Sequence, residues 1–304
     1  MSEATETYGA TLAGMRTILF EQTRLIDSWL HMFKLHQDGG GVFKSGDSEV
    51  LRIVFTMIHM TGISAHSVLK LTEEPSLQTR DCYPIARSIV ESVVNIVFIL
   101  AQGRQAAERA DRHAQQKAYR DLKRKSSAGS WTVTVGSDVK FSPEDEEHMS
   151  TLAAEFTTSR GHEKRNWTDE SLTNRIDTAA KRFPEASVMI LHVAAFNIYR
   201  HASEVLHGTY FAAMHFWGLT TFGRPSPKDR DDLLHTLSEH QFSVLMSTVF
   251  ALSALLECVG DYVGTPELVE NARIEFDRLR DLPLIKEGLA GSGAQGESTP
   301  SSSR

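Results

Sequence analysis

The sequence has few of the residues that mark disulfide-bonded, collagen-like or zinc-binding proteins. It holds only 2 cysteines in 304 residues, Cys82 and Cys258, and they form no CxxC pair. This excludes a disulfide framework and a cysteine zinc site. Its 9 prolines and 20 glycines are too few for a collagen-like or low-complexity chain. We therefore expect a cytoplasmic protein that folds around an ordinary hydrophobic core.

An excess of basic charge is also lacking. The chain has 32 lysines and arginines against 39 aspartates and glutamates, which gives a formal net charge of -7. This excludes a nucleic-acid-binding coat that covers the whole surface, but it leaves room for a local basic patch.

Segments that mark export or membrane insertion are missing from the sequence. The first ten residues carry Glu3 and Glu6 and have no basic start followed by an apolar run, so we expect no signal peptide. The most apolar stretch, residues 242–259, is interrupted by four serines and threonines. We expect it to form a buried core helix rather than a membrane span.

The main pattern that the sequence does contain is a run of apolar residues spaced three and four positions apart. This spacing predicts an all-α protein, a multi-helix bundle. We expect a single helical domain over residues 1–287, followed by a disordered tail of glycine, serine and small polar residues over 288–304. Helices are expected over residues 11–35, 49–71, 84–101, 104–125, 143–158, 168–182, 186–207, 229–262 and 266–280.

One short segment departs from the helical pattern. Residues 131–135 (WTVTV) alternate with a period of two, and Gly136 and Ser137 could turn the chain into residues 139–141. The alternation predicts one small β-hairpin near residues 131–141.

The most distinctive local pattern is YRHASEVLHG, residues 199–208. Arg200 and His207 are about 700° apart on a helix, so both project from one face, with Glu204 between them and Asn197 close by. Arg200, Glu204 and His207 are therefore candidate catalytic residues, because a guanidinium binds phosphate oxygens and an imidazole transfers protons near neutral pH. The alternative interpretation is a buried Arg–Glu pair beside a histidine at the helix end.

A second polar stripe is expected on the helix over residues 84–101. Arg87, Glu91 and Asn95 follow one another at four-residue steps among valines and isoleucines. Two polar stripes in apolar helices avoid the cost of burial most readily by pairing, so we expect this stripe to face the one that contains Arg200, Glu204 and His207. The alternative is an ion pair that only fixes helix packing.

A metal centre is a weaker hypothesis. Glu204 and His207 have the Glu-x-x-His spacing of di-iron bundles, which need a second such pair. The comparable spacings, at residues 145–148 and 232–235, begin with aspartate. Neither a glycine-rich phosphate loop nor an HExxH motif occurs. We expect no metal and no cofactor.

Three motifs in a fixed order resemble a bacterial family. ARSIVES (86–92), RNWT (165–168) and YRHASEVLHG (199–208) are similar to motifs of the bacterial domain-of-unknown-function family five-six-seven-seven. The resemblance covers about residues 50–260 and implies an all-helical protein without an assigned activity.

The Arg-x6-His spacing is similar to the motif of the HEPN superfamily. That resemblance implies a metal-independent endoribonuclease of a toxin or phage-defence system, with RNA as substrate and a homodimer as the active form. Arg200 would stabilise the pentavalent phosphate and His207 would act as general base or acid. HEPN domains are usually shorter units of four or five helices than this chain. The alternative is a non-catalytic helical protein that binds a partner or a small ligand.

The segment over residues 242–256 is apolar around its whole circumference. A surface helix buries only one side. We therefore expect this helix either to pass through the middle of the bundle or to contribute to a homodimer interface.

Overall fold

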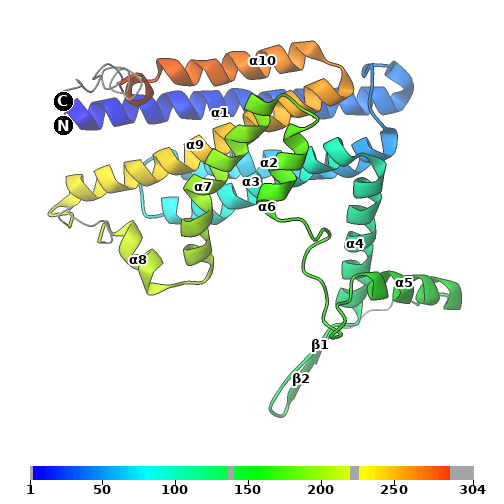
Figure 1. Cartoon of the computed structure of the whole chain (residues 1–304). Coiled ribbons are helices and arrows are strands. Elements are labelled where there is room, and N and C mark those ends of the chain that lie inside the picture. Colours follow the sequence, from blue (N-terminus) through cyan, green and yellow to red (C-terminus); the bar gives the residue numbers. More distant parts are fainter. Residues whose placement is uncertain (1–2, 136–139, 220–225, 288–304) are drawn as a thin grey trace, which may run out of the picture.

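The computed structural model describes residues 3–135, 140–219 and 226–287. Helices make up most of it, with one two-stranded antiparallel sheet (Figure 1). The all-α fold with a small hairpin is thus confirmed. In chain order the elements are α1 (Glu3–Leu35), a π-helical turn (His36–Gly40), α2 (Ser48–Leu71), α3 (Thr79–Gln102), α4 (Arg104–Leu122), β1 (Lys125–Ala128), β2 (Trp131–Thr134), α5 (Pro143–Glu155), α6 (Leu172–Ala180), α7 (Glu185–Leu206), α8 (Tyr210–Phe216), α9 (Arg230–Val263), α10 (Pro266–Asp277) and a 3-10 turn (Arg278–Asp281).

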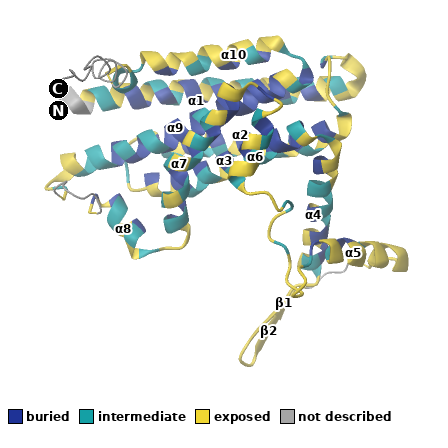
Figure 2. Cartoon of the chain, viewed as in Figure 1, coloured by how far each residue is buried: buried dark blue, intermediate teal, exposed yellow. Residues whose placement is uncertain are grey.

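Helix α9 passes through the middle of the bundle. It packs against α1, α3, α7, α8 and α10, and most of its residues from Val244 to Gly260 are buried (Figure 2). The Asp229 side chain caps its start by accepting bonds from the backbone nitrogens of Asp231 and Asp232. Gly264, at φ +68°, closes its end in the left-handed conformation that glycine adopts without strain. The expected central helix is therefore confirmed.

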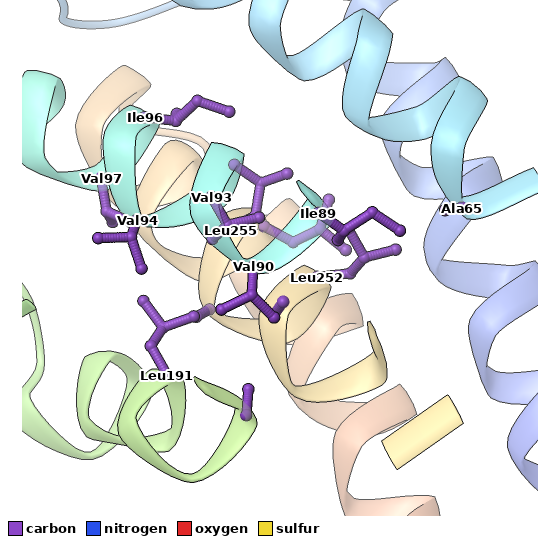
Figure 3. Close-up of a cluster of buried hydrophobic side chains, with 14 of the residues drawn as sticks. Ala65, Ile89, Val90, Val93, Val94, Ile96, Val97, Leu191, Leu252 and Leu255 are labelled. Carbon is purple, nitrogen blue, oxygen red and sulfur yellow. The ribbon is translucent and has the colours of Figure 1, made fainter. Parts of the chain in front are cut away.

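Helix α3 is the second helix of the core. Val90, Val94 and their neighbours interdigitate with Leu252 and Leu255 of α9 and with Leu191 of α7 (Figure 3). The packing of α3, α7 and α9 fixes the positions of the polar side chains that these three helices carry.

Two of the described helices, α3 and α9, are long and apolar enough to cross a membrane by length and composition alone. Their most apolar windows are 56% and 83% buried inside the protein. A core helix of a soluble protein gives the same pattern.

Helix α4 leaves the bundle and carries α5 and the hairpin at its far end (Figure 1). Every residue of both strands is exposed (Figure 2). Trp131 pairs with Ala128 across a two-residue turn at Gly129 and Ser130. The strand β2 therefore pairs with residues that precede it in the chain, not with residues 139–141 as expected. The expected strand over 131–135 is present. The expected turn at 136–137 lies outside the described residues.

Some expected helix boundaries were wrong. Helix α3 begins five residues before Pro84, because Cys82 and Tyr83 are buried and hold an additional first turn. Helix α6 begins at Leu172, four residues later than expected, and Ser171 caps it. The short helix α8 was not expected. The tail over residues 288–304 lies outside the described residues.

Candidate functional site

The polar stripe of α3 pairs with α7 through Tyr199. Nε of Arg87 donates to Oε1 of Glu91 over 2.9 Å, and the hydroxyl of Tyr199 donates to the same oxygen over 2.5 Å. The guanidinium carbon of Arg87 lies 4.0 Å from the centre of the Tyr199 ring. Burial, and then the hydrogen bond to Glu91, raise the pKa of Tyr199. The α7 residue that meets this stripe is thus Tyr199. Among the described residues no hydrogen bond or ion pair joins the stripe to Arg200, Glu204 or His207, which is the pairing that the sequence predicts.

Asn95, the third residue of the stripe, joins the loop before α6 to the bundle. Its Oδ1 accepts from Nε1 of Trp167 over 3.3 Å and from Nη1 of Arg175. Trp167 also packs against Phe98, with ring centres 5.8 Å apart. Burial lowers the pKa of Arg175. Glu91 and Tyr199 also act electrostatically on Arg175, so residues of all three sequence motifs lie close together between α3, α6 and α7.

The second stripe, on α7, is more open than the first. Arg200 and His207 are exposed, and His207 is the residue that ends the helix. Oε2 of Glu204 accepts from the hydroxyl of Thr209 over 2.6 Å. Among the described residues no hydrogen bond or ion pair joins Arg200, Glu204 and His207 to one another. The stripe consequently presents a guanidinium and an imidazole to solvent, with a half-buried carboxylate between them.

A pocket of about 750 Å³ opens beside Arg200, between α3, α7, α8 and α9. Tyr83 and His240 form its buried floor, at 1% and 7% exposure, whereas Arg200 and Phe196 are exposed at its rim. Asn197, one of the expected site residues, also lines it. Glu204 and His207 are not among its lining residues.

Three histidines from three helices meet in this pocket, which we call the histidine pocket. The rings of His201 (α7) and His215 (α8) are stacked, with centres 4.1 Å apart and planes 3° apart. His240 (α9) meets His215 at 4.6 Å with planes 65° apart. The Tyr83 ring lies edge-on to His201 at 6.2 Å and to His240 at 5.9 Å.

Hydrogen bonds fix the protonation of His240. Its Nε2 lies 3.3 Å from the carbonyl oxygen of His215, which only accepts, so Nε2 carries the proton. Its Nδ1, 3.0 Å from the Tyr83 oxygen, therefore accepts from the tyrosine hydroxyl. Burial raises the pKa of Tyr83 and keeps that hydroxyl protonated.

Burial also keeps the imidazoles of the pocket neutral. It is the main cause that lowers the pKa of His240 to about 4 and that of His215 to about 3. The pKa of His201 is lowered as well, by burial and then by the charge of Arg200. Nδ1 of His201 is buried without a hydrogen-bond partner. At neutral pH the pocket thus offers uncharged rings beneath a cationic rim.

Metal ligands are not grouped in the part of the chain that the structure describes. No set of three or more histidine, cysteine, aspartate or glutamate side chains there is placed to hold a metal ion. The histidines of the pocket contact one another through ring faces and edges, not through converging nitrogens.

Sequence reasoning did not single out Tyr83, His215 and His240, and it quoted His201 only as a member of the motif at 199–208. These four residues are widely separated along the chain, and none of them forms a spacing pattern with another. A detectable signal was the number of histidines, 13, but only the packing of α3, α7, α8 and α9 selects which of them meet.

The fold and the site define an all-helical bundle protein with a polar α3–α7 network and a pocket lined by aromatic and imidazole rings. A model described as "Family of unknown function (DUF5677)" matches residues 64–224. Because the match covers more than half of the chain, this protein belongs to that family. The matched region contains all three motifs. No curated protein and no solved structure matches the chain significantly.

Proposed function

We propose that this protein is a HEPN-like, metal-independent endoribonuclease of a toxin or phage-defence system. The observation that carries the proposal is the α7 stripe, on which the exposed Arg200 and the exposed His207 stand two helical turns apart. An RNA strand has to reach both groups from solvent, and neither is covered by another element of the described chain.

The reaction that suits these groups is attack of a ribose 2′-hydroxyl on the adjacent phosphate. The new bond joins the 2′-oxygen to phosphorus and the bond from phosphorus to the 5′-oxygen breaks, leaving a 2′,3′-cyclic phosphate and a 5′-hydroxyl. His207 takes the proton from the 2′-hydroxyl or gives one to the leaving 5′-oxygen, and Arg200 offsets the negative charge that develops on the phosphoryl oxygens.

Glu204 has a positioning role in this proposal. Its carboxylate holds the hydroxyl of Thr209, which also caps α8 by accepting from the backbone nitrogen of Ala212 over 3.2 Å. The bond keeps the turn that contains His207 close to the end of α7. A single copy supplies one His207, so the complementary proton transfer would come from the His207 of a second copy.

Incubation of purified protein with total RNA, with and without EDTA, tests the activity. We expect cleavage in both conditions and products that end in 2′,3′-cyclic phosphate. Arg200→Ala and His207→Ala should each reduce the rate at least about 100-fold, the usual contribution of a group that stabilises developing charge and of a general acid–base group. His192→Ala is the matched control, since His192 lies on the same helix and pairs with Asp177 instead. No cleavage at any protein concentration would contradict the proposal.

The histidine pocket favours a second function, binding of a small ligand without catalysis. A pocket of about 750 Å³ with a few converging polar groups is typical of ligand sites. Cleavage-deficient protein that still binds a ligand in this pocket would favour the second function over the first.

A further inference from the structure

We infer that the histidine pocket binds a single nucleotide, with the base between the rings inside and the phosphate on Arg200 at the rim. The inference rests on the proposed function only in making that nucleotide part of an RNA strand. Three features of the pocket support it: the rings, the polar groups and the charge.

Nearly half of the residues that line the pocket carry flat rings. Tyr83, Phe196 and Tyr199 line it together with the three histidines. The Phe211 ring lies beside the stacked pair His201 and His215, with its plane within 11° of both. Single-stranded RNA is recognised by stacking of its bases on such side chains, histidine included. A flat heteroaromatic base is therefore the ligand shape that these walls favour.

The polar groups inside suit the edges of an uncharged base. Asn197 offers an amide that both donates and accepts, and the Ser243 hydroxyl, which donates to the Glu239 carbonyl oxygen, offers an acceptor. Nδ1 of His201, buried without a hydrogen-bond partner, adds a third polar group. Such groups pair with the ring nitrogens, carbonyls and amino groups of a base, whereas a charged molecule would lose its hydration without a full counter-charge.

Charge places the phosphate at the rim. Among the described residues that line the pocket, Arg200 is the only lysine or arginine. Glu239 lines the pocket too, and its carboxylate disfavours a phosphate on the α9 side. The guanidinium of Arg200 lies 5.7 Å from the centre of the Phe211 ring, which is beside the stacked histidines. A nucleotide fits this order, with its base on the rings and its phosphate beyond them.

Binding is best measured by calorimetry on the full chain, with AMP and CMP as probes. Adenosine, cytidine, ribose 5-phosphate and inorganic phosphate are measured for comparison, since each of them is one part of a nucleotide. We expect the nucleotides to bind more tightly than either parent nucleoside, ribose 5-phosphate or phosphate. Arg200→Ala should weaken binding of AMP and CMP but leave binding of the nucleosides unchanged.

Variants of the ring stack make the test specific to the pocket. His201→Ala should weaken AMP binding at least about fivefold, because one stacking surface is lost, and His201→Phe should restore most of it by keeping a ring. His192→Ala, on the same helix but outside the pocket, should bind as the unchanged protein does. A folded His201→Phe protein keeps the test decisive if His201→Ala does not fold.

The result distinguishes this inference from the proposed activity. His207 does not line the pocket, so His207→Ala should abolish RNA cleavage and retain AMP binding. Nucleotide binding without cleavage would support the pocket and reject the ribonuclease. Cleavage with no binding of AMP or CMP, or binding of ribose 5-phosphate as tight as that of AMP, would overturn the nucleotide pocket and leave the ribonuclease in place.

Discussion

Three consecutive residues of α7 have three different environments. Tyr199 bonds to Glu91 on α3, Arg200 is exposed at the rim of the histidine pocket, and His201 stacks on His215 inside it. Successive residues of a helix are about 100° apart, so one short motif contacts a core network, solvent and a cavity at once. The motif therefore links the polar stripe of α3 to the pocket.

The stripes of the site could be predicted from the sequence, but the histidine pocket could not. Arg87, Glu91 and Asn95 stand at four-residue steps, and helical periodicity alone places them on one face. His215 lies on a seven-residue helix that has no periodic pattern of its own. Its contact with His240 depends on the fold of the chain between them, which no local rule describes.

The neutral histidines should make the protein less stable in mild acid. His240 titrates with a pKa of about 4 when folded, against 6.5 for a free histidine. Between these values the unfolded chain binds more protons, so the free energy of unfolding falls as the pH falls from 6.5 towards 4. The loss due to His240 is about 1 kcal/mol per pH unit, and His215 adds to it. Urea unfolding at pH 7, 6 and 5 measures this slope.

A variant that does not titrate checks the cause. His240→Gln keeps a donor and an acceptor on the pocket floor but does not titrate, so we expect the stability to depend less steeply on pH. At pH 7 the variant should be less stable than the unchanged protein, because the ring contacts of His240 are lost. Equal slopes for the unchanged protein and His240→Gln would refute this assignment.

At the scale of elements, periodicity predicted nearly all the long helices, and the errors fall at their ends. Pro84 favours the first turn of a helix, yet α3 begins at Thr79 because Tyr83 is held by the bond to His240. Thr168 resembles a cap, but Trp167 beside it is held by Asn95, and Ser171 caps α6 instead. In each case a contact with a distant helix decides the boundary.

Close approach of α9 and α10 predicts an unusual effect of alanine. A Cβ added to Gly260 would lie 2.8 Å from Cγ2 of Val269, 3.2 Å from the Val269 backbone nitrogen and 3.3 Å from the Thr265 carbonyl oxygen. Alanine usually stabilises a helix relative to glycine, but this crowding against backbone should dominate. We expect Gly260→Ala to lower the free energy of unfolding by about 1–3 kcal/mol, measured in urea.

The matched substitution is Gly9→Ala in α1, where nothing lies within 4 Å of the added Cβ. Only the backbone effect operates there, so stability should rise by roughly 0.5–1 kcal/mol. If both alanine variants were more stable than the unchanged protein, the predicted crowding between Gly260 and α10 would be refuted.

At the scale of the whole molecule, the family match and the pocket do not coincide. The match over residues 64–224 ends before α9, yet α9 supplies His240, Glu239 and Ser243 to the pocket. Helix α9 also holds α1 and α10 against the rest of the bundle. The central helix thus has two tasks, to complete the core and to close the α9 side of the pocket.

The exposed face of α7 predicts the assembly of the molecule. Met189, Val193 and Phe196 are 38%, 47% and 85% exposed, and they lie at three- and four-residue steps that continue to Arg200. An apolar row that leads to the proposed catalytic stripe suits a second copy of the same face, which would bring two His207 residues together. We expect sedimentation equilibrium at micromolar concentration to give twice the chain mass of 33.9 kDa.

A charge in this row should separate the two copies. Val193→Glu should give a mass near 33.9 kDa and reduce RNA cleavage at least about 100-fold, as loss of a catalytic group does. Its AMP binding should persist, because Val193 does not line the histidine pocket. Ile63→Glu is the matched control, since Ile63 on α2 is also 47% exposed and should leave the mass unchanged. An unchanged protein that stays near 33.9 kDa at every concentration would reject the dimer, and cleavage by that monomer would show that one stripe suffices.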